Sequence, residues 1–270
     1  MSLHEVLDIA LCSDSGVVRA HNEDSVFADA DLGLAILADG MGGYNAGEVA
    51  SGMATSLLAT GFARLLRQAE TDEKLLENPE QLIEDEVRGS NAAIFNASQT
   101  QAKYSGMGTT LVLAWFVVGR MYIAHVGDSR AYRWRDGKLV ALTRDHSLLQ
   151  EQIDNGMISL DEARVSANRN LVTRALGIEP DVQVDITAHV IRPGDLLLLC
   201  SDGLNDMLDD EQIAEVLEMH QGDLTQTAGQ LVQTANDLGG RDNISVILVR
   251  VLSEVSTQGG WWDKLLGKLK

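Results

Sequence analysis

The chain has 270 residues, 45% of them hydrophobic, and its 40 acidic and 21 basic side chains give a formal net charge of −19. This length and composition allow one large buried core, and we expect a single main domain. Such an acidic surface repels polyanions, so the composition argues against nucleic acid and anionic membranes as general partners.

Targeting features and cysteine usage indicate a soluble, cytoplasmic protein. The longest apolar run, residues 111–119, is far shorter than the roughly 20 residues of a transmembrane helix. The N-terminus lacks the basic and apolar regions of a signal peptide. Cys12 and Cys200 lie in apolar runs without CxxC spacing, which is typical of buried thiols in a reducing compartment.

The N-terminal part of the chain reads as strands followed by two helices. Apolar runs separated by polar or glycine-rich joints predict strands at 6–11, 25–28 and 34–38. From Asn45, a plausible cap, the apolar side chains recur at helical spacing, and a second such segment covers 79–102. The acidic stretch 70–77 between them is expected to be a mobile connection.

The remainder of the chain returns to strands and then adds a second helix pair. Strands joined by tight turns predict an antiparallel meander at 109–118, 121–125, 131–134 and 139–142. Residues 146–180 are polar and predict a short helix followed by an irregular excursion over the surface. The last predicted elements are strands at 182–190, 196–200 and 244–251 and helices at 210–218 and 224–237. Without βαβ alternation, this order favours an antiparallel α+β layered domain.

Short acidic clusters beside glycine, asparagine or arginine recur along the chain. Each one alone is ordinary turn chemistry. The strands before Asp39 and Asp202 are continuously apolar, however, so both should be buried and should deliver a carboxylate to the edge of the core. Too few lysines and arginines lie nearby to neutralise these groups, and hard divalent cations such as Mg²⁺ or Mn²⁺ are the natural compensation.

Taken in order, these clusters carry a family resemblance. The matching stretches are Ser15-Gly16-Val17-Val18-Arg19 with Asn22-Glu23-Asp24, Ala38-Asp39-Gly40-Met41-Gly42-Gly43, Gly106-Met107-Gly108-Thr109-Thr110, Gly127-Asp128-Ser129-Arg130, Leu142-Thr143-Arg144-Asp145-His146-Ser147, Ser201-Asp202-Gly203-Leu204 and Arg241-Asp242-Asn243-Ile244-Ser245. No single motif is decisive, but the ordered set, covering about residues 5–251, resembles the metal-dependent type 2C (PPM/PP2C) serine/threonine protein phosphatases of the bacterial type.

The resemblance implies an architecture and a division of the chain. It implies an α+β four-layer α-β-β-α sandwich, in which two antiparallel sheets carry the metal site at one edge and helix pairs lie outside. Residues 1–252 would form the catalytic domain, with a flap at about 146–180. Residues 253–270 would be an amphipathic tail outside it.

The resemblance also implies a ligand set for two core ions, Mn²⁺ or Mg²⁺. Asp39 matches the bridging carboxylate, and Gly40 would offer its backbone carbonyl. Glu23 would add a ligand on one side, and Asp202 and Asp242 would complete the other. All of these groups are oxygen donors, as such ions require.

Three further residues match the family around this core. Asp24 would act through an intervening water, and Asp128, together with Asp202, matches positions that hold a third, weaker ion in bacterial relatives. Arg19 matches the phosphate clamp, for which the planar fork of a guanidinium is suited.

The proton donor for the leaving group is left open. Many eukaryotic relatives have a histidine where this chain has Met41, which cannot donate a proton. A metal-bound water, His21 or His125 could serve instead, although a lone histidine is more often a structural hydrogen-bonding group.

Several neighbouring residues have two readings each. Asn243 could orient Asp242 or form an Asx turn. Asp206 could support the metal shell through water or simply begin a helix. Thr109 and Thr110 read as a structural turn into a buried strand.

The resemblance implies hydrolysis of phosphoserine and phosphothreonine on proteins by a water activated between two ions, in opposition to a protein kinase. The alternatives are a phosphoprotein-binding regulatory module with little activity and a small-molecule phosphomonoesterase. Loss of metal ligands would mark the binding module, and here Glu23, Asp39, Asp202 and Asp242 are all present. We expect a monomer.

Two segments outside the ligand set carry separate predictions. Residues 157–169 correspond to the family's flap and are expected to influence substrate choice. In the tail, residues 259–270, helical spacing would gather Trp261, Trp262, Leu265, Leu266 and Leu269 on one face with lysines elsewhere. This predicts either docking to a membrane or partner, or packing of the tail back onto the body.

Overall fold

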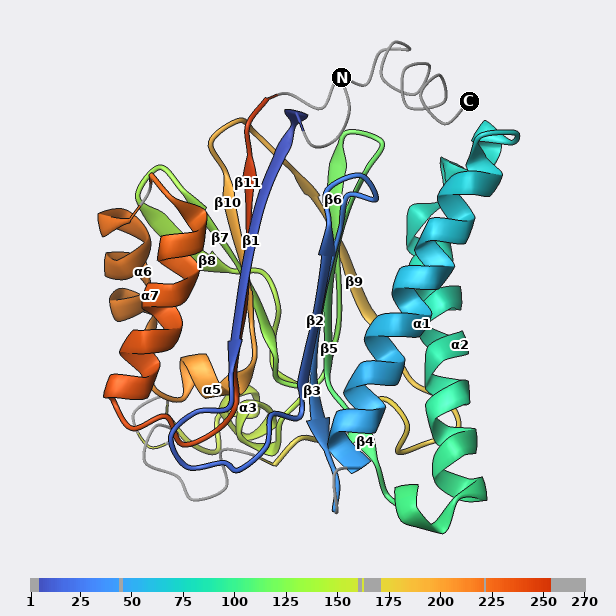
Figure 1. The fold of residues 1–270 in the computed structure, drawn as a ribbon, viewed down its shortest axis with the longest axis horizontal. Coiled ribbons are helices and arrows are strands. Elements are labelled where there is room, and N and C mark those ends of the chain that lie inside the picture. Colours follow the sequence, from blue (N-terminus) through green and yellow to red (C-terminus); the bar gives the residue numbers. More distant parts are fainter. Residues whose placement is uncertain (1–4, 44–45, 160–161, 163–170, 221, 254–270) are drawn as a thin grey trace.

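The fold is a sandwich of two antiparallel sheets enclosed by two helix layers (Figure 1). The computed structural model describes residues 5–43, 46–159, 162, 171–220 and 222–253. Over these residues the order of layers is helix, sheet, sheet, helix, which confirms the expected four-layer α+β architecture.

Each sheet combines strands from distant parts of the chain. The first, called the β1 sheet, has the order β1 (Leu7–Asp14), β11 (Ile244–Val251), β10 (Leu196–Cys200), β7 (Arg130–Arg135) and β8 (Lys138–Ala141). The second, called the β3 sheet, has the order β2 (Asp24–Asp29), β3 (Leu34–Met41), β5 (Leu111–Val117), β6 (Arg120–Val126) and β9 (Asp185–Val190), with β4 (Gly108–Thr109) paired to the end of β3.

The helices form one pair on each outer face. The β3 sheet is covered by α1 (Ala46–Ala69) and α2 (Pro79–Thr100), and the β1 sheet by α6 (Asp210–Met219) and α7 (Leu224–Asp237) (Figure 1). By length and composition α1 could cross a membrane, with a mean hydropathy of 1.3. One side of it, which includes Leu58 and Phe62, is buried in the core beneath it, as in the core helix of a globular domain.

The continuously apolar strands explain the layering, because both of their faces are buried. Along β3, Leu34 and Ile36 pack toward the helix pair, whereas Ala35 and Leu37 pack between the sheets. The same alternation divides β10 between the helix-covered core and the central core. Three apolar cores therefore separate the four layers.

The predicted meander is wrong at one point, because its four strands do not share a sheet. β5 and β6 form a hairpin in the β3 sheet, while β7 and β8 form a hairpin in the β1 sheet. The chain crosses between the sheets at residues 127–129, where Gly127 has a φ of 105°. Local turn signals predict hairpins but cannot say which sheet a hairpin joins.

The other predicted helices and strands differ from the observed ones mainly at their ends. The strands at 196–200 and 244–251 and the helix at 224–237 have the predicted bounds. The acidic connection expected at 70–77 contains a 3₁₀ helix, η2 (Glu73–Glu77), and a second one, η3 (Ala102–Tyr104), follows α2. The one-turn helix α5 (Asp202–Asn205) was not predicted, because four residues are too few for a periodic signal.

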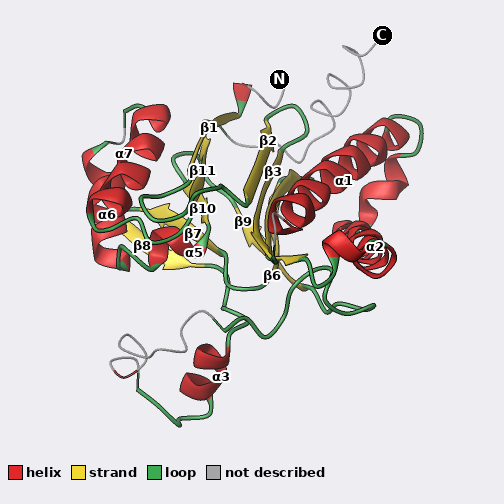
Figure 2. Ribbon diagram, turned by 60° about the horizontal axis from the view of Figure 1, so that its bottom comes forward, coloured by secondary structure: helices red, strands yellow, loops and turns green. Residues whose placement is uncertain are grey.

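The excursion begins with the short helix that was predicted there. Helix α3 (Leu148–Asp154) is capped by Ser147, whose hydroxyl accepts a hydrogen bond from the Gln150 backbone. Figure 2 shows α3 standing apart from the four layers. Residues 160–161 and 163–170 of the expected flap, and the tail at 254–270, lie outside the described residues, so the predictions about them remain predictions.

Candidate metal centre

Two carboxylates of the β3 sheet face each other across neighbouring strands. Asp24 begins β2 and Asp39 lies near the end of β3, and they are directly opposed in the antiparallel register. Like charges at opposed positions destabilise a sheet. A proton or a cation between them would relieve this repulsion.

The β1 sheet and the crossing between the sheets add three more carboxylates at the same edge. Asp202 begins α5 directly after β10, and Asp242 lies two residues before β11. Asp128 lies in the crossing between β6 and β7 and is only 6% exposed. The acidic cluster, as we call Asp24, Asp39, Asp128, Asp202 and Asp242, therefore draws on both sheets.

Hydrogen bonds join the two sheets at this edge. The Ser201 hydroxyl donates to Asp24 Oδ2 at 2.9 Å. The buried Asn243 accepts the Glu23 backbone N–H at 2.8 Å and donates to the backbone carbonyls of Ser15 and His21. The Asn243 side chain thus organises the loop that carries Arg19 and Glu23.

Asn243 holds Asp242 through its backbone. The backbone N–H of Asn243, rather than its side chain, donates to Asp242 Oδ1 at 2.9 Å. This is an Asx-type contact, and it holds the carboxylate while the side chain serves the neighbouring loop.

The backbone of Asp39 is fixed by the two threonines that were expected to be structural. Asp39 N–H donates to Thr110 Oγ1 at 3.0 Å, and its carbonyl accepts from Thr110 N–H and Thr109 Oγ1, both at 2.8 Å. Thr110 Oγ1 also shares a 2.7 Å hydrogen bond with Ser129 Oγ, beside Asp128. These bonds link the positions of two carboxylates.

Burial and mutual repulsion raise the pKa values of Asp24, Asp39, Asp128 and Asp202. Burial raises the pKa of Asp39 well above its usual range, and the charges of Asp24, Asp202, Asp128 and Asp242 add to the shift. Burial followed by the charge of Asp128 does the same for Asp202. Burial is also the main cause that raises the pKa of Asp24 and of Asp128 to about 6.

The residues present fit divalent cations. Asp24 Oδ1 and Asp202 Oδ1 are buried and have no hydrogen-bond partner among the described residues. Asp39 and Asp202 are enclosed by protein yet keep part of their surface accessible. Carboxylate and carbonyl oxygens with free lone pairs are the donors that Mg²⁺ and Mn²⁺ prefer.

Gly40 is required by a close approach of the backbone. A Cβ at this position would lie 2.2 Å from the carbonyl oxygen of Gly47 in α1 and 2.6 Å from that of Glu23. The Gly40 N–H also donates to the Glu23 carbonyl at 3.1 Å. Glycine therefore lets the end of β3, the Glu23 loop and the start of α1 meet at the cluster.

Arg19 reaches the acidic cluster but contacts one of its carboxylates. Its Nη2 donates to Asp242 Oδ2 at 2.7 Å, and its side chain remains 53% exposed. A guanidinium has five N–H donors, so one contact with Asp242 leaves donors for an arriving anion. Arg19 therefore lies beside Asp242, and its role as a phosphate clamp remains a prediction.

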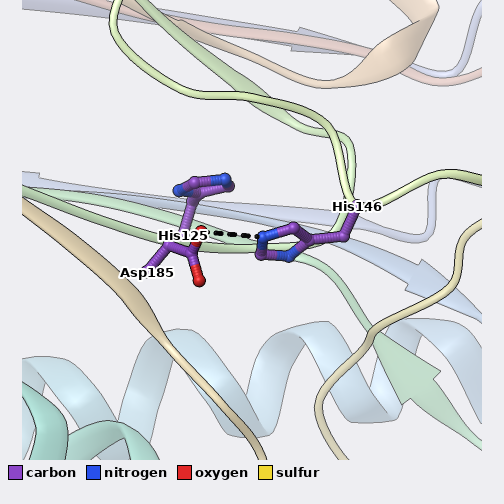
Figure 3. Close-up of side chains that lie close together, drawn as sticks. All are labelled: His125, His146 and Asp185. Carbon is purple, nitrogen blue, oxygen red and sulfur yellow. Dashed lines mark ion pairs between the residues drawn. The ribbon is translucent and has the colours of Figure 1, made fainter. Parts of the chain in front are cut away.

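A second polar cluster lies where the excursion joins the sandwich. Figure 3 shows His125, His146 and Asp185 close together, and their ligand atoms all lie within 4.8 Å of one another. The two imidazole rings are stacked, with centroids 4.6 Å apart. With Arg174, these residues form what we call the histidine cluster.

The histidine cluster already contains its own cation. Arg174 Nη1 donates to Asp185 Oδ1 at 2.9 Å and lies 3.2 Å from His146 Nε2. Burial raises the pKa of Asp185, but the contacts with His146 and Arg174 outweigh it and lower that pKa. A guanidinium in this place is a simpler partner for the carboxylate than a metal ion.

The histidine cluster also bears on the missing proton donor. His125 is only 6% exposed, and its Nε2 donates to the Arg144 carbonyl at 2.8 Å. Burial lowers its pKa. These contacts support the structural reading of His125, one of the two histidines considered as the acid.

Sequence reasoning missed the supporting residues rather than the carboxylates. Ser201, His146 and Arg174 were not singled out for the contacts they make. Serine, histidine and arginine carry no local pattern that distinguishes such a contact, because their partners are 177, 19 and 11 residues away.

The chain is similar to proteins that are named as phosphatases. The family described as "Protein phosphatase 2C" matches residues 17–245. The chain is 39% identical over 241 residues to "Serine/threonine phosphatase stp" of Listeria welshimeri, covering 88% of this chain and 93% of that protein.

A second relative links the sequence to solved structures. The chain is 41% identical over 247 residues to "Serine/threonine protein phosphatase PstP" of Mycobacterium tuberculosis, covering 92% of this chain but 45% of the relative, so it spans about half of that protein's length. A crystal structure of PstP superposes with a TM-score of 0.83 at 38% identity, covering 92% of this chain and 99% of the other. Another, of the PstP catalytic domain in complex with two manganese ions, has a TM-score of 0.77 at the same identity and coverage.

Proposed function

Because the chain belongs to the protein phosphatase 2C family, whose members include hydrolases named as serine/threonine phosphatases, we propose that it hydrolyses phosphoserine and phosphothreonine on proteins. The single observation that carries the proposal is the acidic cluster. Its five carboxylates meet at one edge, two of their buried oxygens lack a hydrogen-bond partner among the described residues, and burial raises the pKa values of four of them. Cations would remove this electrostatic cost.

The residues would divide between two core ions as follows. Asp39 would contact both, the Gly40 carbonyl and Glu23 would serve one of them, and Asp202 and Asp242 would serve the other. When bound, the pair supplies an activated water and stabilises charge on the phosphoryl group. A manganese complex of a relative that is 38% identical supports this choice of ion.

Two further carboxylates would act around this core. Asp24, whose Oδ2 is already held by Ser201, would act through an intervening water. Asp128, whose charge raises the pKa of Asp202, would hold a third and weaker ion together with Asp202. This accessory ion is part of the proposal.

Arg19 would position the substrate. Its guanidinium would hold phosphate oxygens while the Asp242 contact keeps the side chain over the cluster. Met41, which is partly buried at the end of β3, supplies no proton at the place where some relatives have a histidine.

The biological setting belongs to the same proposal. We place the protein in the cytoplasm as a monomer, opposite a serine/threonine kinase. The two free cysteines support a reducing compartment, since neither forms a disulfide within the described residues.

The test is Mn²⁺-dependent phosphate release from a phosphothreonine peptide. The Asp39→Asn variant should lose this turnover, because an amide cannot bridge two cations as a carboxylate does. Asp136→Asn is the matched control, since it makes the same change at an exposed turn whose left-handed backbone asparagine tolerates.

The outcomes separate the candidate functions. Metal-independent turnover, or an active Asp39→Asn variant, would contradict the proposed mechanism. Peptide binding without turnover would favour the regulatory module. Turnover of small phosphorylated metabolites but not of phosphopeptides would favour the phosphomonoesterase.

A further inference from the structure

The histidine cluster lies where the excursion leaves the sandwich and returns to it, because His146 comes soon after β8 and Asp185 begins β9. Ser147 and Val172 form an isolated antiparallel bridge, and the Thr173 N–H donates to the His146 carbonyl at 2.8 Å. These contacts close a neck around the excursion, with His146 at its base.

His146 also holds both backbone polar groups of Gly127, the residue before Asp128. The His146 N–H donates to the Gly127 carbonyl at 2.9 Å, and the Gly127 N–H donates to His146 Nδ1 at 3.1 Å. A ring nitrogen that accepts a hydrogen bond carries no proton, so the Gly127 contact requires the tautomer with the proton on Nε2. That atom lies 3.3 Å from Asp185 Oδ2 and 3.2 Å from Arg174 Nη1, so in this tautomer Arg174 approaches Nε2 without donating to it.

Gly127 also packs closely against Thr110. A Cβ at this glycine would lie 2.8 Å from the Thr110 side chain. Thr110 is itself bonded to Ser129, on the far side of Asp128. The turn that carries Asp128 is therefore held at Gly127 by His146 and at Ser129 by Thr110.

We propose that His146 is a positioning residue for the accessory cation at Asp128. It holds the Gly127–Asp128 turn in the ligand orientation through Nδ1 and joins that turn to the neck of the excursion through its own backbone. The inference rests on the accessory ion of the proposed function. Because coupling between sites is reciprocal, filling the site at Asp128 should in turn stabilise the neck.

Two substitutions at His146 separate its contacts. In His146→Asn the side-chain oxygen takes the place of Nδ1, so the acceptor for the Gly127 N–H is retained and the contact with Asp185 is lost. In His146→Gln the side-chain amide reaches the place of Nε2, so the contact with Asp185 is retained and the acceptor is lost. His189→Gln, at the other end of β9, is the matched control.

Calorimetric titration with Mn²⁺ measures binding without relying on activity. We expect His146→Gln to weaken the weakest binding event by about tenfold, the lower end for residues that orient metal ligands. His146→Asn and His189→Gln should stay close to the wild-type value, and the tighter events should be unchanged in all three. Both variants lose the stacked ring, so in thermal unfolding we expect them to be destabilised to a similar extent.

A purely structural role for His146 predicts a different pattern. Both variants would then weaken the site to a similar extent, in proportion to their loss of thermal stability. That result, or wild-type affinity in His146→Gln, would overturn the proposal.

Hydrogen exchange in the unmodified protein keeps the proposal testable if neither variant folds. Mg²⁺ at concentrations that fill the weakest site should slow exchange at Gly127 and Thr173 together, and should slow neither in Asp128→Asn. Slowing at Gly127 without any change at Thr173 would contradict the coupling.

Failure here is distinguishable from failure of the proposed function. If calorimetry finds only two bound ions in the wild type, the positioning role is wrong. Mn²⁺-dependent turnover and its loss in Asp39→Asn would still support the phosphatase.

Discussion

The acidic cluster and the histidine cluster solve the same electrostatic problem in opposite ways. Both place buried or half-buried ionisable groups beside the turn at Gly127. In the histidine cluster, Arg174 neutralises Asp185 from within the chain. In the acidic cluster five carboxylates lie together, and Arg19 contacts one of them, Asp242. A site whose internal positive charge is too small for its carboxylates is suited to a cation from solution.

Removal of the metal ions should have the largest effect, and it should act on the acidic cluster rather than on the histidine cluster. We expect a chelator to abolish turnover and to lower the melting temperature, because only the folded state holds the carboxylates together. Adding Mn²⁺ at about 100 times its dissociation constant should restore about 2.7 kcal/mol of stability. Calorimetric unfolding with and without Mn²⁺ measures this difference.

The control for the metal effect comes from the other cluster. Asp185→Asn should keep the full Mn²⁺-dependent shift, whereas Asp202→Asn should lose much of it. An equal loss in both variants would mean that the two clusters do not differ in the way described.

The second prediction is that folding stability depends on pH with opposite signs in the two clusters. Asp24 has a pKa raised from 3.8 to about 6, so the folded metal-free protein binds its proton more tightly than the unfolded chain. Its contribution to stability is complete below pH 4 and is lost as pH rises through about 6, by an amount on the order of 3 kcal/mol. Burial, with His125 and Arg174, lowers the pKa of His146, so its contribution is lost as pH falls instead.

Thermal unfolding of the metal-free protein from pH 4.5 to 7.5 tests these signs. Asp24→Asn should flatten the loss of stability toward high pH, since an amide does not titrate. Saturating Mn²⁺ should also remove that loss, because the cation takes the place of the proton. A metal-free protein that became steadily more stable up to pH 7.5 would contradict the assignment.

The third prediction concerns the ion pair between Asp185 and Arg174, the cation of the histidine cluster. Asp185→Asn should destabilise the fold by about 1 kcal/mol, a modest effect because the Asp185 and Arg174 side chains are 43% and 33% exposed. For a chain of this size we expect a fall in melting temperature of about 2–4 °C. Asp136→Asn, at an exposed turn, should change it less. If the melting temperature of Asp185→Asn did not fall, water would replace the carboxylate without any loss of stability.

The smallest effect is expected for His21→Ala. Loss of a general acid would cost about 100-fold or more in turnover, and we expect less than about twofold because His21 is exposed and only its backbone carbonyl is held. His125→Ala should instead lower thermal stability through loss of the stacked ring and the Arg144 contact. Turnover and pH profiles of both variants on a phosphopeptide provide the measurement.

Much of the secondary structure could be read from local pattern. The continuous apolar run 196–200 matched β10, and the helical spacing of 224–237 matched α7, because both signals reside in neighbouring residues. The hairpin at β5 and β6 and the one at β7 and β8 were also recognisable. Their assignment to different sheets was not, because it depends on which distant strands lie beside them.

The candidate site divides in the same way. Asp39 and Asp202 were identifiable because each follows a buried strand, a local feature. That Asp24 lies directly opposite Asp39, and that Ser201 holds Asp24, depends on pairing between residues far apart in the chain. The histidine cluster had no local signal, since His146, Arg174 and Asp185 meet only when the excursion closes.

The amino-acid sequence by itself determined which residues could bind cations and that their strands would be buried, because residue chemistry and apolar periodicity are local properties. Only the tertiary structure decided that carboxylates of two sheets meet at one edge without enough positive charge, while a neighbouring carboxylate receives Arg174. Electrostatic free energy depends on distance and burial, and both arise only when the layers pack.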